Sequence, residues 1–137
     1  MCMWDGYEDS PSVYRSKIQR TRKERKCGEC NRKIAIGEPY QNVFMVYDGA
    51  PRTFVMCQHC LVAATWLVEN CGGYLLEGVW EDVHSHVSEL HRPQYRAVYR
   101  GLRRLEVGRE RQWQRFDQTG LMALPKLPPV VDEKMAA

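Results

Sequence analysis

The sequence predicts an α+β fold in which a small β-hairpin and a helix are held together by cysteines and followed by two or three further helices. Three observations indicate this fold. Two Cys-x-x-Cys pairs, Cys27 with Cys30 and Cys57 with Cys60, stand on either side of a segment of 26 residues. That segment is rich in aromatic and β-branched residues, as strands are. The chain after Cys60 instead carries apolar residues at the spacing of amphipathic helices.

The hairpin is expected between the two cysteine pairs. The run YQNVFMVY over residues 40–47 has the composition of one strand, and RTFVM over residues 52–56 has that of its partner. Asp48 and Gly49 lie between the two runs, and an Asp-Gly pair favours the positive φ angles of a tight hairpin turn. Gly37 marks another turn just before the first strand.

Two helices are expected directly after the second cysteine pair. The first covers residues 61–70 and ends at Gly72, since glycine suits the left-handed residue that closes a helix. The second covers residues 78–90, where apolar residues recur every three or four positions. Trp66 and Trp80 fall on the apolar faces of these helices, so we assign both to the core.

A third helix is expected after Pro93, because proline fits the first turn of a helix. Gly108 is expected to interrupt this helix. Its apolar face is predicted to consist of Tyr95, Val98, Tyr99, Leu102 and Leu105.

The positive charge of the chain is concentrated in two segments. The formal net charge is only +3, but nine of the twenty Lys and Arg residues lie between residues 15 and 33, and eight lie between residues 92 and 115. The stretch 34–91 carries seven acidic residues and a single base, Arg52. Charge segregated in this way creates local fields that the net charge hides.

Composition divides the chain into four segments. Residues 1–26 form an acidic lead and a basic stem, 27–90 a finger domain, 91–118 an Arg-rich helical extension and 119–137 a flexible Pro-containing tail. The lead is expected to be extended or poorly ordered over about 14 residues. We expect the stem to be a flexible cationic arm, because no apolar stripe anchors it.

No apolar run is long enough to span a bilayer, and the N-terminus lacks the basic-then-apolar order of a secretory signal. We therefore expect a cytoplasmic protein with no membrane partner. In a reducing compartment, paired cysteines are more often metal ligands than disulfides.

The four paired cysteines predict one structural zinc ion. Zinc accepts four thiolates in a tetrahedron, and each Cys-x-x-Cys turn presents two sulfurs to one ion. The predicted ligands are Cys27, Cys30, Cys57 and Cys60. A redox Cys-x-x-Cys pair and reduced core cysteines are the alternatives. With four thiols at hand, His59 is expected to be exposed.

A second metal site is imaginable and stays open at this stage. His84 and His91 share a helix face and His86 does not, which makes a common metal ion harder to form. Positions at the edge of an apolar helix face explain the three histidines without a metal. The candidate ligands would be Cys2, Cys71, His84, His86 and His91.

Two cationic regions and one tryptophan are predicted to contact a partner. An aromatic ring can stack on a base while neighbouring arginines contact phosphates. Trp113 lies in such Arg-rich surroundings. The same composition is enriched at protein interfaces, so the partner is a nucleic acid or a host protein. The predicted contact residues are Arg20, Arg22, Lys23, Arg25, Lys26, Arg32, Lys33, Arg96, Arg100, Arg103 and Trp113.

The order of cysteine knuckle, hairpin and helix resembles the treble-clef group of zinc fingers. More closely, the chain resembles a family of small zinc-binding proteins encoded by phages and prophages. The shared features are an MC opening, RKERKCGEC, IGEPY, a YDG turn, CQHC at the head of a helix and a GGY loop, which together cover residues 1 to about 90. The resemblance implies a zinc-stapled accessory protein in the host cell cytoplasm, from a family without a settled activity.

We expect a binding protein and not an enzyme, with no small-molecule substrate. Four thiolates leave zinc no open position for a reacting group. Some nucleases of the His-Asn-His type carry two Cys-x-x-Cys pairs with catalytic histidines near the hairpin, but no histidine lies between Cys30 and Cys57. Nucleic-acid binding or regulation is the first hypothesis. The second is a protein that inhibits or modulates a host defence or transcription protein, and a nuclease is the last.

Overall fold

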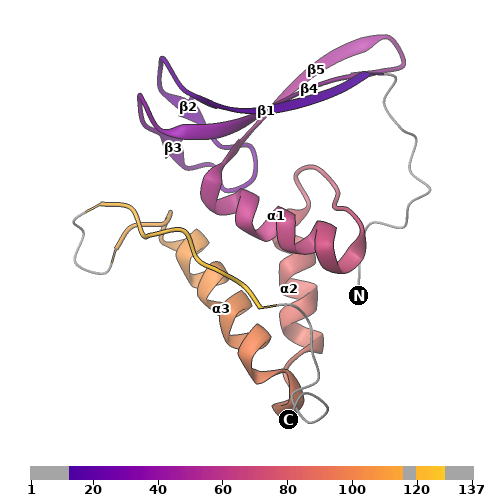
Figure 1. The fold of residues 1–137 in the computed structure, drawn as a ribbon, viewed down its shortest axis with the longest axis vertical. Coiled ribbons are helices and arrows are strands. Elements are labelled where there is room, and N and C mark those ends of the chain that lie inside the picture. The colour runs from indigo at the N-terminus through magenta and orange to yellow at the C-terminus, as the bar shows by residue number, and fades with distance from the viewer. Residues whose placement is uncertain (1–12, 116–119, 129–137) are drawn as a thin grey trace.

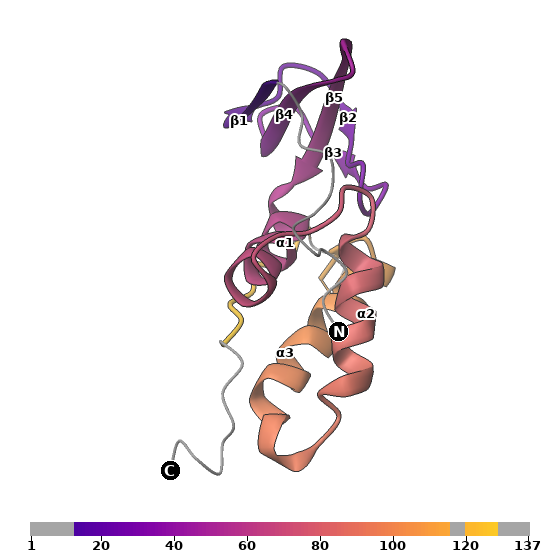
Figure 2. The ribbon, with the colours of Figure 1, turned by 90° about the vertical axis from the view of Figure 1, so that its right-hand side faces the viewer.

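A computed structural model describes residues 13–115 and 120–128 of the 137-residue chain. Within these residues the fold is α+β, with antiparallel strands in two sheets and three α-helices, as predicted. The sheets lie at one end of the molecule, and α2 and α3 lie side by side at the other with α1 between (Figures 1 and 2). None of the described helices combines the length and hydrophobicity that crossing a membrane requires.

The larger sheet has three antiparallel strands in the order β1-β4-β5. The strands are β1 (Val13–Arg20), β4 (Pro39–Tyr47) and β5 (Ala50–Cys57). The two-residue turn between β4 and β5 consists of Asp48 and Gly49, with φ angles of 49° and 77°. Positive φ at both positions matches the twist of the flanking strands. The predicted hairpin and its turn are therefore confirmed.

The first strand corrects the prediction for the basic stem. Its residues pair with β4 throughout, with Arg15 opposite Phe44 and Lys17 opposite Asn42. The stem is thus a sheet strand up to Arg20 and not a flexible arm. Its cations fit an edge strand, where charged side chains reach solvent on both faces of the sheet. Residues 1–12, predicted to be extended or poorly ordered, lie outside the described residues.

The first cysteine pair occupies a knuckle between two short strands, β2 (Arg25–Lys26) and β3 (Lys33–Ile34). The N–H of Cys27 donates to the carbonyl of Arg32 at 2.9 Å, and the N–H of Gly28 donates to Val55 of β5 at 2.7 Å. A Cβ atom on Gly28 would lie 2.7 Å from the Phe54 ring. Glycine is therefore required where the knuckle touches the hairpin.

The helices follow the predicted order. They are α1 (Gln58–Cys71), α2 (Val79–Glu89), a 3-10 turn η1 (Pro93–Tyr95) and α3 (Arg96–Glu110). Gly72 closes α1 in the left-handed conformation, with a φ of 82° and its N–H donating to Val68. The predicted glycine stop, the second helix and the start of the third near Pro93 are confirmed.

Two predictions for the end of α3 are wrong. The helix continues through Gly108, because the absent side chain makes room for Trp113; a Cβ there would lie 2.5 Å from the indole. Gln112 and Trp113 then reverse the chain with φ angles of 53° and 64°. This reversal buries Trp113 completely, so the indole is not available to stack on a partner.

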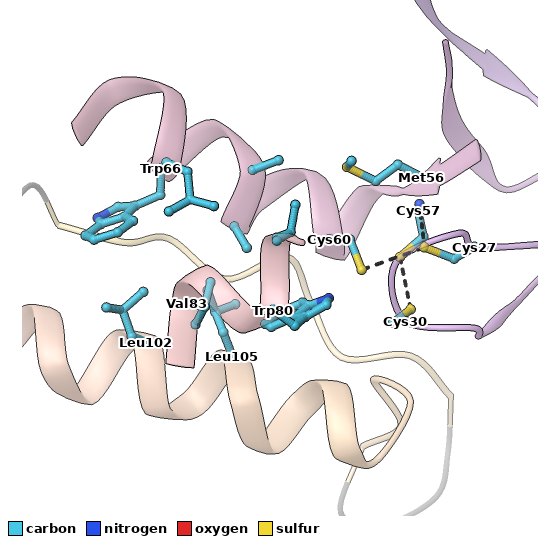
Figure 3. Packing of buried hydrophobic residues seen from close by; sticks show 14 of the residues in the cluster. Cys27, Cys30, Met56, Cys57, Cys60, Trp66, Trp80, Val83, Leu102 and Leu105 are labelled. Atoms are coloured by element: carbon cyan, nitrogen blue, oxygen red, sulfur yellow. Dashed lines mark hydrogen bonds between the residues drawn. The ribbon is translucent and has the colours of Figure 1, made fainter. Parts of the chain in front are cut away.

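The core is one continuous cluster of buried side chains. It extends from the four cysteines past Trp80 to Leu102 and Leu105 on α3 (Figure 3). Trp66 and Trp80 belong to it, as predicted from their helical positions. The cluster joins residues of the predicted finger domain to residues of the Arg-rich extension.

The segment 120–128 belongs to the predicted mobile tail, yet it packs against the body of the protein (Figure 1). Trp66 Nε1 donates to the carbonyl of Pro128 at 3.1 Å. A Cβ on Gly101 of α3 would lie 2.7 Å from Leu127. Buried apolar neighbours and hydrogen bonds hold this segment, which its proline-rich composition does not reveal.

Candidate metal centre

The structure brings the four predicted ligands together. All four sulfurs lie within 4.8 Å of one another. The knuckle supplies Cys27 and Cys30, the last residue of β5 is Cys57, and Cys60 stands in the first turn of α1. Local turns thus set each pair, and the β4–β5 hairpin brings the second pair back to the first.

The spacing of the sulfurs fits a tetrahedral zinc site. Cys27 Sγ lies 3.7 Å from Cys60 Sγ, and Cys30 Sγ lies 3.8 Å from Cys57 Sγ. Sulfurs about 2.3 Å from a tetrahedral zinc ion lie about 3.8 Å from one another. A disulfide would instead require about 2.05 Å. The four cysteines are therefore placed as a ligand set, which disfavours the redox alternative.

The site is closed. Cys27, Cys57 and Cys60 have no exposed surface, and Cys30 retains 7%. Four protein sulfurs complete the coordination of a tetrahedral ion, and the burial leaves no approach for a reacting molecule. The arrangement suits a metal that stabilises the fold.

Backbone and helix dipoles favour thiolates at this site. The N–H groups of Glu29 and Cys57 approach Cys27 Sγ at 3.4 and 3.3 Å. Hydrogen bonding with the other thiols, first Cys30, lowers the pKa of Cys27, whereas hydrogen bonding with Cys27 raises the pKa of Cys60. A metal ion removes this competition, because all four sulfurs then bind as thiolates.

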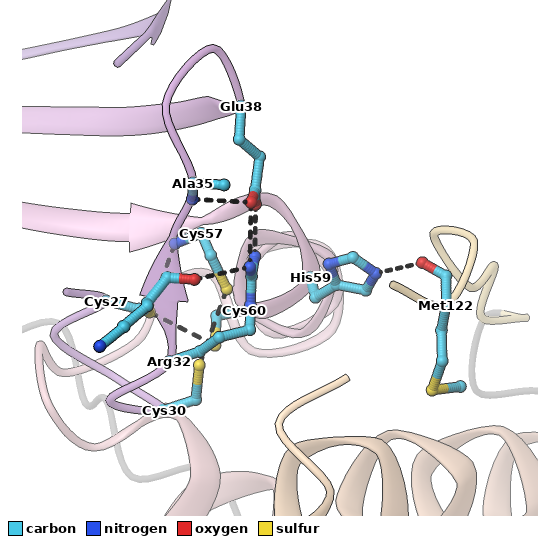
Figure 4. Close-up of polar contacts among 10 residues, drawn as sticks. Cys27, Cys30, Arg32, Ala35, Glu38, Cys57, His59, Cys60 and Met122 are labelled. Carbon is cyan, nitrogen blue, oxygen red and sulfur yellow. Dashed lines mark hydrogen bonds and ion pairs between the residues drawn. The ribbon is translucent and has the colours of Figure 1, made fainter. Parts of the chain in front are cut away.

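Arg32 was predicted to contact a partner, and the structure places it in the interior beside the metal site (Figure 4). Its side chain is 5% exposed and donates to both carboxylate oxygens of Glu38, at 3.0 and 2.5 Å. Burial opposes the charge, but hydrogen bonding to Glu38 and the attraction of Cys57 together raise its pKa. A zinc tetrathiolate carries a charge of about −2, so a nearby guanidinium stabilises it.

Glu29 is a buried residue of the knuckle whose structural role the sequence did not reveal. Its buried carboxylate accepts hydrogen bonds from the N–H groups of Glu77 at 2.7 Å and Val79 at 3.3 Å. It thereby satisfies the N–H of Val79, the first residue of α2, and the N–H of Glu77 just before the helix, where the N-cap Gly78 offers no side chain. Burial raises the pKa of Glu29 to about 7 despite these two donors. No local sequence signal links residues 48 positions apart.

His59 lies next to the site but outside the ligand set, and the prediction that it is exposed is wrong. The imidazole is 4% exposed and stacks on Trp113 with 4.9 Å between ring centroids. Its Nε2–H donates to the carbonyl of Met122 at 2.7 Å (Figure 4). Burial lowers its pKa, so it remains neutral in this role.

The other histidines have structural partners. His86 Nδ1 lies 2.8 Å from the carbonyl and 3.1 Å from the carboxylate of Asp82, both residues being buried. His84 Nδ1 lies 2.8 Å from Glu106 and links α2 to α3. Within the described part of the chain, the four cysteines are the one group placed to hold a metal ion. Cys2 lies outside that part.

The predicted contact cations fall into two separate groups. The first belongs to the sheet and the knuckle, where Arg20 donates to the carbonyl of Gly37 and the guanidinium of Arg25 lies 5.4 Å from the Tyr40 ring. The second group lies on α3, where Arg96 and Arg100 are exposed. Arg103 pairs with Glu106 at 2.7 Å. The start of α3, which carries Arg96 and Arg100, lies at the end of the molecule opposite the sheets (Figures 1 and 2), so the two groups lie on different surfaces.

Comparisons with protein-family models, with curated proteins and with solved structures found no match to this chain.

Proposed function

We propose that this protein is a zinc-stabilised module that binds nucleic acid. The observation that carries the proposal is a set of exposed cations on rigid backbone beside the metal centre. These cations are Arg15, Lys17, Arg20, Arg22, Lys23, Lys26 and Lys33. Most of them stand on strands or on the short turn after β1, so their positions are set before a partner arrives. Phosphate contacts from such residues supply the main part of nucleic-acid affinity.

One face of the sheet adds an aromatic side chain to these cations. Arg15, Phe44 and Thr53 stand opposite one another across β1, β4 and β5. All three are exposed, Phe44 by 38%. Lys17 and Asn42 follow two residues along the same face. An aromatic ring among cations and amides can stack on a base while its neighbours contact phosphates.

Zinc has a structural role in this proposal. The four thiolates hold the knuckle to the end of β5 and the start of α1, which keeps the cations of β2 and β3 next to those of β1. A tetrathiolate ion has no vacant position for an activated water, which supports a binding role over hydrolysis. The resemblance to phage-encoded zinc proteins supports the host cytoplasm as the place of action.

Salt dependence tests the proposal. Fluorescent duplex and single-stranded oligonucleotides should bind tightly at low salt, with a log–log slope of about −0.9 per contacted phosphate on duplex DNA. Replacing Arg22, Lys23, Arg25 and Lys26 by alanine should weaken binding and reduce this slope by about 3 to 4 units if each contacts one phosphate. Zinc content should stay the same.

Replacing Arg92, Arg96, Arg100 and Arg104 by alanine provides the control, because it removes four charges at the other surface. If both quadruple variants lose affinity equally, net charge and not the sheet and knuckle determines binding. If the wild type does not bind at low salt, nucleic acid is not the partner.

A protein partner is the second candidate, and a specific feature of β1 favours it. Strand β1 is an edge of the larger sheet, paired within the described residues with β4 alone, and its Tyr14 and Ile18 are 53% and 50% exposed. A free strand edge with apolar side chains can add a strand from another protein. A nuclease-treated pull-down from host lysate, compared with a Tyr14→Lys, Ile18→Lys variant, would identify such a partner.

A further inference from the structure

A cleft of about 730 Å³ separates the knuckle from the segment that follows α3. The knuckle side and the C-terminal side come from residues about 80 positions apart in the chain, and in Figure 1 the segment after α3 lies on the side of the molecule that carries β2 and β3. Its lining residues are Glu24, Arg25, Lys26, Asn31, Arg32, Lys33, Ala35, Glu38, Gln112, Gln114 and Leu121.

The lining is polar and cationic. Four cations face two carboxylates, and one of these carboxylates, Glu38, is already paired with Arg32. The opposite wall supplies the neutral amides Gln112 and Gln114. Ala35 and Leu121 are the apolar residues among those that line the cleft. The excess of cations suits an anion, and the amides suit a ligand that also carries hydroxyl groups.

Arg25 is held in place within the lining of the cleft. Its guanidinium lies 5.4 Å from the centroid of the Tyr40 ring, which orients the group. Within the described structure its Nε atom is buried and has no hydrogen-bond acceptor. This nitrogen has no exposed surface, so contact of Arg25 with a ligand in the cleft depends on the rest of its guanidinium.

We propose that this cleft binds the sugar–phosphate backbone of a nucleic-acid strand and continues the cationic surface of β1. Arg25, Lys26 and Lys33 contact phosphate oxygens, and the amide of Gln114 donates a neutral hydrogen bond from the opposite wall. This inference rests on the proposed function and adds the place where the nucleic-acid strand binds beside the knuckle. It also adds an uncharged residue, Gln114, to the contact surface.

Gln114 allows a test that separates the cleft from general electrostatics. Gln114→Glu keeps the size of the side chain and places a negative charge beside the bound phosphate. Gln94→Glu makes the same change of charge in η1, outside the lining of the cleft. Affinity for a fluorescent single-stranded oligonucleotide is measured for both variants and the wild type at several salt concentrations.

Gln114→Glu should weaken binding by about fivefold or more, from repulsion at contact distance, and Gln94→Glu should have little effect. Gln114→Ala, which leaves the charge unchanged, should weaken binding by about two- to tenfold without changing the salt slope. Equal zinc content and circular dichroism spectra establish that the variants are folded.

The outcomes distinguish the cleft from the wider proposal. If Gln114→Glu and Gln94→Glu bind alike while the quadruple alanine variant of the stem is impaired, the cleft is not the site and nucleic-acid binding remains. If the wild type binds no oligonucleotide at low salt, both proposals are wrong.

Discussion

The strands β2 and β3 of the knuckle have two residues each, whereas α2 and α3 have eleven and fifteen. The knuckle contributes Cys27, Cys30 and Ile34 to the core, and the helices contribute tryptophan, valine and leucine side chains. Two-residue strands cannot stabilise a turn by backbone pairing alone. We therefore expect a metal bound by the four cysteines to stabilise the knuckle, and apolar burial to stabilise the helical half formed by α2, α3 and the side chains packed on them, although the two share one core.

Loss of the metal should have the largest effect and should act unequally on the two halves. Structural zinc contributes about 10–16 kcal/mol of apparent binding free energy in finger peptides, more than a small domain's usual net stability. Chelation or Cys57→Ser should therefore unfold the knuckle and the end of the β4–β5 hairpin that carries Cys57. Amide hydrogen exchange should rise there first and later in α2 and α3.

Zinc added back after chelation should restore protection in the wild type but not in Cys57→Ser. Uniform loss of protection across the chain would mean that the two halves do not differ in this way. Elemental analysis that finds no zinc in folded, reduced protein would show that zinc does not stabilise the knuckle.

The reverse effect is expected from Trp113→Ala, which leaves a cavity in the helical half against His59 and Trp80. Truncation of a buried tryptophan typically lowers the free energy of unfolding by about 3–5 kcal/mol. Urea denaturation should show this loss while the zinc content of the folded protein stays at one ion per chain. Phe44→Ala, at an exposed aromatic, is the control and should change stability little.

Glu29 connects the knuckle to the start of α2, so its replacement should lower the stability of both halves, by less than Trp113→Ala does. Glu29→Ala leaves the N–H groups of Glu77 and Val79 without their acceptor, at a cost of about 1–3 kcal/mol. Glu29→Gln keeps one acceptor oxygen and should lie between Glu29→Ala and the wild type. Urea denaturation of the three proteins measures the order.

The titration of Glu29 gives this comparison a pH dependence. Its folded-state pKa of about 7 lies above the ordinary value of 4.5, so the folded protein binds more protons in this window. The stability of the wild type relative to Glu29→Gln should therefore fall as pH rises from about 4.5 to about 7 and stay level above it. A difference that rises with pH would show that the two N–H donors outweigh burial.

The metal centre was predictable because its information is local. Cys-x-x-Cys spacing sets two sulfurs on one turn, and the Asp48-Gly49 turn returns the second pair to the first. The helices were predictable for the same reason, since Gly72 closes α1 and apolar spacing marks α2 and α3. The exposure of the cations was harder to predict, because charge in a sequence does not say whether a side chain lies at the surface.

The sequence alone determined the two cysteine pairs of the candidate metal site, the β4–β5 hairpin and the order of the helices, because each depends on residues a few positions apart. The tertiary structure decided that the basic stem is an edge strand, that Arg32 pairs with Glu38, and that Trp113 covers His59. Charged or aromatic side chains in these positions suit either surface or interior. Which one they occupy depends on partners far along the chain, since a buried charge requires its counter-ion and a large ring requires a space such as that over Gly108.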